Sequence, residues 1–101
     1  MGIPVVWLEV ARDDLREIVA YIGRDNPQAA EREGNTIISK IEKLSLMPTR
    51  GSVVEEVGDP SIRQIVYRHY RIVYKLYEEP AHIEIWRIWH GARDTLELPP
   101  E

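Results

Sequence analysis

The chain has 101 residues, 44% of them apolar and 30% charged, which is the length and composition of one globular domain with a single hydrophobic core. Cysteine is absent, which excludes a disulfide framework and a thiolate metal site and indicates a reducing compartment, so we expect a cytoplasmic protein. The sequence shows no signal-peptide pattern and no apolar run near the roughly 18 residues that a membrane span needs, so we expect no membrane partner.

The net charge of −4 is unevenly distributed. Residues 1–60 carry seven Lys/Arg against eleven Asp/Glu, residues 61–93 carry six against three together with all three histidines, and residues 94–101 add three acids. A dedicated nucleic-acid binder is usually basic as a whole, so we expect no direct sequence-specific DNA binding by this chain alone. The local basic surface either receives an acidic protein partner or is simply a solvated face.

Taken in chain order, the sequence first predicts a buried strand and a helix. Val5–Val10 is apolar enough for the strand, and the acids of Asp13–Glu17 suit the start of a helix, with Asp14 and Glu17 at capping-box spacing. Gly23 is expected to end this helix. Its apolar face follows the i, i+3, i+4, i+7 pattern, on Leu15, Ile18, Val19 and Ile22.

A second helix follows a short turn. Asn26 is a preferred N-cap residue and Pro27 suits the first helical position, and the apolar pattern continues to about Leu46. Gly34 is unfavourable in a helix interior, so we expect it to permit a close approach of the first helix. Two antiparallel helices joined by so short a turn form a helical hairpin.

The second half of the sequence predicts a sheet. Arg50–Ser61 is a connecting segment, and residues 94–101 are expected to run extended over the surface because prolines 99 and 100 prevent a helix. Between them lie three segments rich in β-branched and aromatic residues, each predicted to be a strand and joined to the next by a hairpin turn. They are Arg63–Tyr67, Tyr70–Tyr77 and His82–Trp89.

These segments resemble, in this order and at these distances, the RelE/ParE superfamily of toxins from bacterial type II toxin–antitoxin modules, and are closer to ParE. The resemblance covers about residues 5 to 94. It is carried by Asp14-Leu15-x-x-Ile18-x-x-Tyr21-Ile22, Asn26-Pro27-x-Ala29-Ala30, Leu44…Pro48…Gly51, Arg63…Tyr70-Arg71-Ile72-Val73-Tyr74 and His90-Gly91-Ala92-Arg93. It implies an α+β fold of order β-α-α-β-β-β, with the helical hairpin packed on one face of a small, twisted, mainly antiparallel sheet.

The resemblance implies a toxin that is neutralised by a cognate antitoxin, and it leaves the target open. ParE-type members poison DNA gyrase without known catalytic residues, whereas RelE-type members are ribosome-dependent mRNA interferases with extra Lys and Arg at the helix–sheet connection. Here that connection, Arg50–Ser61, has one basic residue and three acids, which would repel ribosomal RNA. The sequence therefore favours a ParE-like gyrase inhibitor. The alternatives are an mRNA interferase and a non-toxic interaction module of the same fold.

If the chain were a ribonuclease, it would need a group to activate the 2′-hydroxyl and cations to stabilise the phosphorane. The candidates for these roles are Arg63, Arg71, Arg87, His90 and Arg93. Each also has a structural interpretation: the strand arginines keep the sheet soluble, His90 bonds the following turn, and Arg93 pairs with Asp94. We expect no cofactor and no metal, because the three histidines lack the spacing of a metal site.

The last predicted strand also offers residues for partner binding. Trp86 and Trp89 are three residues apart, which predicts opposite faces of the sheet, one in the core and the other exposed or covered by a partner. Arg87 lies on the same predicted face as Trp89, and Trp and Arg are enriched at interface hot spots. We therefore expect Arg87, Trp89 and Arg93 to contact the antitoxin. The alternative is that both tryptophans pack under the helices or the C-terminal tail.

Overall fold

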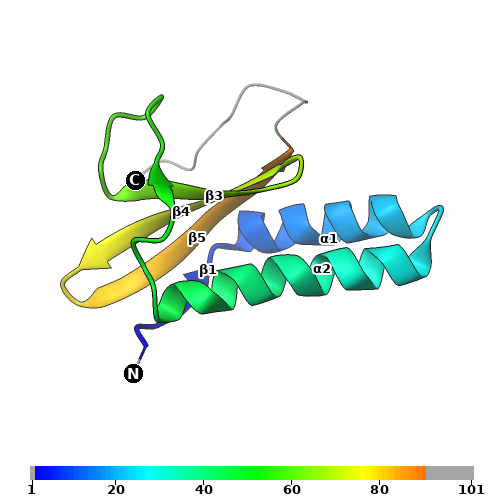
Figure 1. Ribbon diagram of the computed structural model, residues 1–101, viewed down its shortest axis with the longest axis horizontal. Helices are drawn as coiled ribbons and strands as arrows, with labels where there is room; N and C mark the ends of the chain where they lie inside the picture. Colours follow the sequence, from blue (N-terminus) through cyan, green and yellow to red (C-terminus); the bar gives the residue numbers. More distant parts are fainter. Residues whose placement is uncertain (1, 91–101) are drawn as a thin grey trace.

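The computed structural model describes residues 2–90 and shows two helices packed on one side of a sheet (Figure 1). In chain order the elements are β1 (Val5–Trp7), α1 (Glu9–Gly23), α2 (Pro27–Glu42), the short 3-10 helix η1 (Lys43–Ser45), β2 (Ser52–Val53), β3 (Ile62–Tyr67), β4 (Tyr70–Glu78) and β5 (Ala81–His90). Neither α-helix within residues 2–90 has the length and apolar composition that crossing a membrane requires.

The sheet has five strands in the order β1-β5-β4-β3-β2, with β1 parallel to β5 and every other pair antiparallel. This confirms the predicted α+β fold and its mainly antiparallel sheet. The predicted element order lacks β2, which pairs only Ser52 with Gln64 and Val53 with Arg63. A strand of two residues has no periodicity that sequence could reveal.

The helical hairpin forms as predicted. The Asn26 side chain accepts a hydrogen bond of 3.0 Å from the Ala29 N–H, and Pro27 opens α2. Gly34 is buried against α1, and a Cβ at this position would lie 3.0 Å from Cγ2 of Val19. The absent side chain therefore lets the two helices approach each other closely.

The start of α1 differs from the prediction. The strand ends at Trp7 rather than Val10, and α1 begins at Glu9, with Leu8 at the N-cap position and no side-chain cap. The Leu8 N–H is hydrogen-bonded to the Ile85 carbonyl, so pairing with β5 continues up to the first turn of the helix. Asp14 thus lies within α1 and on its buried side, where it cannot cap the helix.

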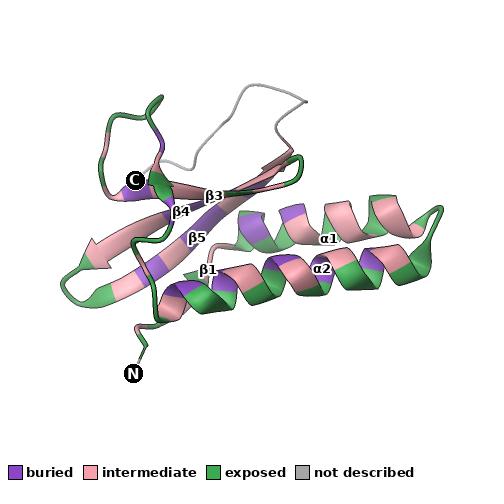
Figure 2. Cartoon of the chain, in the orientation of Figure 1, coloured by how far each residue is buried: buried purple, intermediate pink, exposed green. Residues whose placement is uncertain are grey.

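Hydrophobic cores cover both faces of the sheet. Ile72 and Tyr74 of β4 belong to the larger cluster, which includes Ile37 and Ile41 of α2, while Val73 belongs to a smaller cluster with Trp86. Because neighbouring strand residues point to opposite faces, the first cluster lies under the helices and the second on the other side of the sheet. Figure 2 shows the buried residues recurring along both helices and β5.

A bulge in β5 changes the predicted placement of the two tryptophans. Tyr74 pairs with Ile85 but its neighbour Val73 pairs with Arg87, so Trp86 is an extra residue between the two pairs. An extra residue reverses the alternation of faces beyond it. Trp86 packs on Val73, and Trp89 pairs with Arg71, two residues from Val73 on β4. The tryptophans therefore share the face away from the helices, and the prediction of opposite faces was wrong. Trp86 is in the core, 3% exposed, and Trp89 is half-buried.

Candidate functional site

A groove runs between α1 and the last residues of β5. Strand β1 pairs with β5 only at residues 83–85, and within residues 2–90 no strand continues along this edge. Helix α1 lies there instead, and the cavity between them has a volume of about 360 Å³. Its lining combines acids, aromatic rings and an arginine: Asp14, Glu17, Ile18, Tyr21, Tyr70, Arg87, Ile88, Trp89 and His90.

The floor of the groove is held by the carboxylate of Asp14. Arg87 donates to it from Nε at 2.7 Å and from Nη2 at 2.9 Å, and the backbone N–H of Ile88 donates at 3.0 Å. The Asp14 side chain therefore takes the position of a neighbouring strand on the edge of β5. Asp14 is only 7% exposed, so these charge-assisted hydrogen bonds are shielded from solvent.

The wall of the groove that the strands form is aromatic. The His90 ring stacks on His69 with ring centroids 5.7 Å apart and meets the edge of Tyr70 at 5.4 Å. On the opposite wall, Tyr21 of α1 is 60% exposed. Rings with one polar end, placed around a buried ion pair, suit the binding of a protein segment rather than a small charged substrate.

Arg71 lies behind Trp89, on the face of the sheet away from the helices. Its guanidinium is 5.5 Å from the Trp89 ring centroid, its Nε donates to Gln64 Oε1 at 2.6 Å, and its Nη1 lies 3.0 Å from a carboxylate oxygen of Glu56. The hydrogen bond from Arg71 lowers the pKa of Glu56. The charge of Arg71 is therefore balanced by the acidic β2–β3 connection.

Arg63 is hydrogen-bonded to the backbone of the connection that precedes β2. Its Nη1 donates to the Gly51 carbonyl at 2.7 Å, next to the hydroxyl of Tyr74, which donates to the Pro48 carbonyl and accepts from the Gly51 N–H. Burial raises the pKa of the Tyr74 hydroxyl. Together the two side chains anchor the backbone between α2 and the sheet.

Two of the candidate ribonuclease groups, Arg87 and His90, line the same groove, where Arg87 is bound to Asp14, but Arg63 and Arg71 lie elsewhere. His90 pairs with Tyr70 and Arg63 with Tyr74, four positions apart on β4, or about 13 Å along the strand. Arg71 points to the opposite face from both, by the alternation of the strand. Arg93 lies outside the described residues.

Comparison with known proteins gives the family. The family model described as "ParE toxin of type II toxin-antitoxin system, parDE" matches residues 5–95. The chain belongs to the ParE toxin family. It is therefore a toxin of the type II toxin–antitoxin class. No curated protein matches the sequence.

Two solved structures share the fold of this ParE family member. A chain of the chromosomal ParDE toxin–antitoxin system from P. aeruginosa has a TM-score of 0.73 at 17% identity, covering 88% of this chain and 96% of that one. A chain of the RelBE2 toxin–antitoxin complex from Mycobacterium tuberculosis has a TM-score of 0.67 at 22% identity, covering 89% and 99%. At these identities the likeness establishes the fold alone.

Of the predicted partner-binding residues, Arg87 and Trp89 line the groove together with His90, with the Trp89 ring lying at the β5 edge against Arg71, on the face away from the helices. Sequence reasoning missed the contribution of α1, namely Asp14 and Tyr21. Their spacing of seven residues places them on one helix face, but the capping-box spacing of Asp14 with Glu17 favours the different interpretation given above. Within residues 2–90, no cluster of three or more His, Asp or Glu side chains lies close enough to hold a metal ion.

Proposed function

We propose that this ParE family toxin inhibits DNA gyrase through protein–protein contact, and that a cognate antitoxin neutralises it by covering the groove between α1 and β5. The observation that carries the first part is that Arg63 and Arg71 lie apart from the groove that holds His90 and Arg87. Arg63 is bonded to backbone carbonyls, and Arg71 is neutralised by Glu56 on the opposite face. A nuclease needs its base, its cations and its proton donor within hydrogen-bond reach of one phosphate.

The acidic connection between β2 and β3 supports the same target. Glu55 and Glu56 are both exposed, and Glu56 pairs with Arg71 on the face of the sheet that the helices leave open. Carboxylates at this place oppose the approach of ribosomal RNA but not that of a protein surface. This is why we assign the toxin a protein target.

The groove supports the second part of the proposal. Two solved relatives of this fold come from ParDE and RelBE toxin–antitoxin systems, and the groove joins Trp89, a partly exposed aromatic anchor, to the buried Arg87–Asp14 pair. Buried aromatic and arginine anchors dominate the energy of protein interfaces. Arg93 remains a predicted contact residue.

The groove assignment is tested by Trp89→Ala, compared with Tyr77→Ala as a matched aromatic truncation outside the groove. We expect Trp89→Ala to weaken antitoxin binding by about 2 kcal/mol, measured by titration calorimetry, because it removes an anchor. We expect Tyr77→Ala to leave the affinity unchanged, with thermal melts recorded for both. Equal affinities for the two variants would refute the assignment.

The gyrase assignment is tested with purified toxin, gyrase, ATP and relaxed plasmid. We expect the toxin to block supercoiling, and the cognate antitoxin to restore it. In parallel, the toxin is incubated with translating ribosomes and a labelled mRNA. Codon-dependent cleavage of the mRNA, with supercoiling unaffected, would overturn the proposal.

A further inference from the structure

A second surface feature lies on α2 and shares no residue with the α1–β5 groove. It is a shallow groove of about 390 Å³ with three cations and three neutral polar side chains and no acid. We call it the α2 basic stripe: Arg32, Asn35, Thr36, Ser39, Lys40 and Lys43. Arg32 and Lys43, the first residue of η1, are eleven residues apart, or about 16 Å along a helix.

The sequence leaves these cations without helical partners. None of the three has an acid three or four positions away, whereas on α1 Arg12 and Arg16 each follow an acid by three residues. Among residues 2–90 none of the three takes part in an ion pair, while Arg16 pairs with Asp13 at 2.7 Å. Lys40 and Lys43 are neighbours of like charge, an arrangement that disfavours the isolated helix. Helix α2 also carries the acids Glu31, Glu33 and Glu42, but within residues 2–90 none of them forms an ion pair with these three cations.

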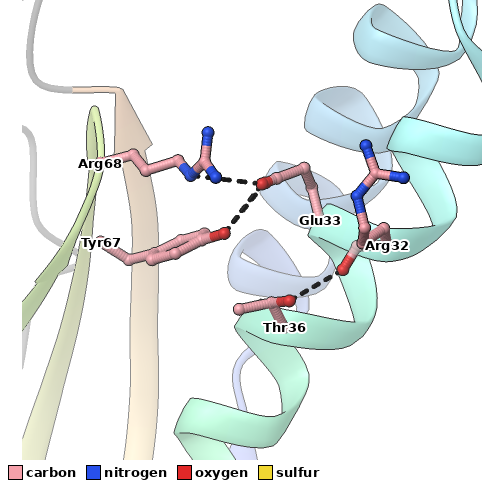
Figure 3. Close-up of polar contacts among 5 residues, drawn as sticks. All are labelled: Arg32, Glu33, Thr36, Tyr67 and Arg68. Carbon is pink, nitrogen blue, oxygen red and sulfur yellow. Dashed lines mark hydrogen bonds and ion pairs between the residues drawn. The ribbon is translucent and has the colours of Figure 1, made fainter.

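Glu33, the acid that directly follows Arg32, is bound to the β3–β4 hairpin. The Tyr67 hydroxyl donates to both carboxylate oxygens of Glu33, at 2.8 and 3.0 Å, and Nε of Arg68 lies 3.4 Å from one of them. Figure 3 shows Glu33 reaching across to the β3–β4 hairpin, while Arg32 takes no part in these contacts. The Lys40 ammonium lies 5.2 Å from the Tyr67 ring centroid. In the hairpin, Arg68 thus balances the charge of Glu33, and the ring of Tyr67 contacts Lys40.

The stripe continues into an apolar end. Leu46 and Met47 are 72% and 52% exposed, and both of their N–H groups are hydrogen-bonded to the Lys43 carbonyl, which places them one helical turn beyond Lys43. Exposed apolar side chains next to cations that form no ion pair suit a partner that is itself amphipathic. Nucleic acid would use the cations alone, and the net charge of −4 would oppose its approach.

We propose that the α2 basic stripe is a second docking surface, which binds a protein segment with carboxylates opposite Arg32, Lys40 and Lys43 and apolar side chains opposite Leu46 and Met47. The occupant is an acidic amphipathic segment of another protein. The surface is separate from the α1–β5 groove, so its existence does not depend on gyrase being the target.

The proposal is tested with the full chain and a fluorescein-labelled helical peptide of about 16 residues, long enough to follow the stripe. The peptide carries glutamates along one face and leucines at one end, and a matched peptide has glutamine for every glutamate. Anisotropy titrations compare the wild type with Arg32→Gln/Lys43→Gln. The control, Arg12→Gln/Arg16→Gln, removes the same charge from α1.

We expect the acidic peptide to bind and the glutamine peptide not to bind. The stripe variant should weaken binding about fivefold, because two exposed ion pairs are lost, while the α1 control changes it little. Equal weakening by both variants would show non-specific attraction and overturn the proposal. So would no binding of the acidic peptide, or tighter binding of a labelled duplex RNA of similar length.

Discussion

Replacing Asp14 by alanine should be the most damaging single truncation of a charged residue in α1. Asp14 is the one acid of this helix that is buried within the described residues, and its carboxylate accepts from Arg87 twice and from the Ile88 N–H. The variant leaves a partly buried guanidinium and a backbone N–H without their acceptor. It therefore opens the edge of β5 on which the groove is built.

The magnitude follows from the burial of the pair. Removing one partner of a buried ion pair costs about 3–5 kcal/mol. The Arg87 side chain is 22% exposed, so water can partly solvate it after the substitution, and the lower end of this range applies. We expect Asp14→Ala to reduce the free energy of unfolding by about 3 kcal/mol, a large share of the 5–15 kcal/mol typical of a domain. Asp14→Asn keeps one acceptor oxygen and should cost less.

The neighbouring residue provides the control. Asp13 pairs with Arg16 at the same distance of 2.7 Å, but these side chains are 59% and 70% exposed. Asp13→Ala should therefore cost under about 1 kcal/mol. Urea denaturation of both variants and the wild type at pH 7, followed by circular dichroism, measures the difference. Equal losses for Asp13→Ala and Asp14→Ala would refute the reasoning that burial makes the Asp14 pair important.

Two further substitutions test the packing around the helices and the sheet. Gly34→Ala should destabilise the protein by about 1 kcal/mol in urea denaturation, because the added Cβ would lie 3.0 Å from Val19 Cγ2; a gain in stability would contradict this close approach. Tyr74→Phe should cost about 2 kcal/mol at pH 7, because the Gly51 N–H loses its acceptor. Burial raises the pKa of Tyr74, so its proton is held more tightly in the folded state and wild-type stability should fall as pH rises above about 10. Tyr74→Phe should lose less stability over this pH range than the wild type. Parallel curves of unfolding free energy against pH for the two proteins would be evidence against this effect.

The regular elements were predictable because each is determined by neighbouring residues. The start of α2 is determined locally, because the Asn26 side chain caps the helix and the Pro27 ring suits its first position. Strands β3 to β5 are long enough for their enrichment in β-branched and aromatic residues to be recognised in the sequence. Their observed ends differ from the predicted ends by about one residue. Local chemistry therefore gives the order of the longer elements, whereas β2 and the pairing of β1 with β5 were beyond it.

The floor of the candidate groove could not be predicted in the same way. Asp14 and Arg87 are 73 positions apart, and only the pairing of β5 with β1 and the path of α1 bring them together. The spacing of Asp14 and Glu17 offered a local interpretation, capping, which the real start of the helix at Glu9 overrides. The bulge at Trp86 likewise depends on register across two strands, and a single residue of shift changed the face of Trp86 relative to Trp89.

The most direct test of a gyrase-directed toxin is induced expression in a sensitive bacterium, with plasmid supercoiling, DNA synthesis and protein synthesis measured by pulse labelling over the first generation. We expect supercoiling and DNA synthesis to fail first, with an SOS response, while protein synthesis continues, and we expect co-expressed antitoxin to prevent all of these effects. A prompt fall in protein synthesis with cleaved mRNA, before any change in supercoiling, would contradict this expectation.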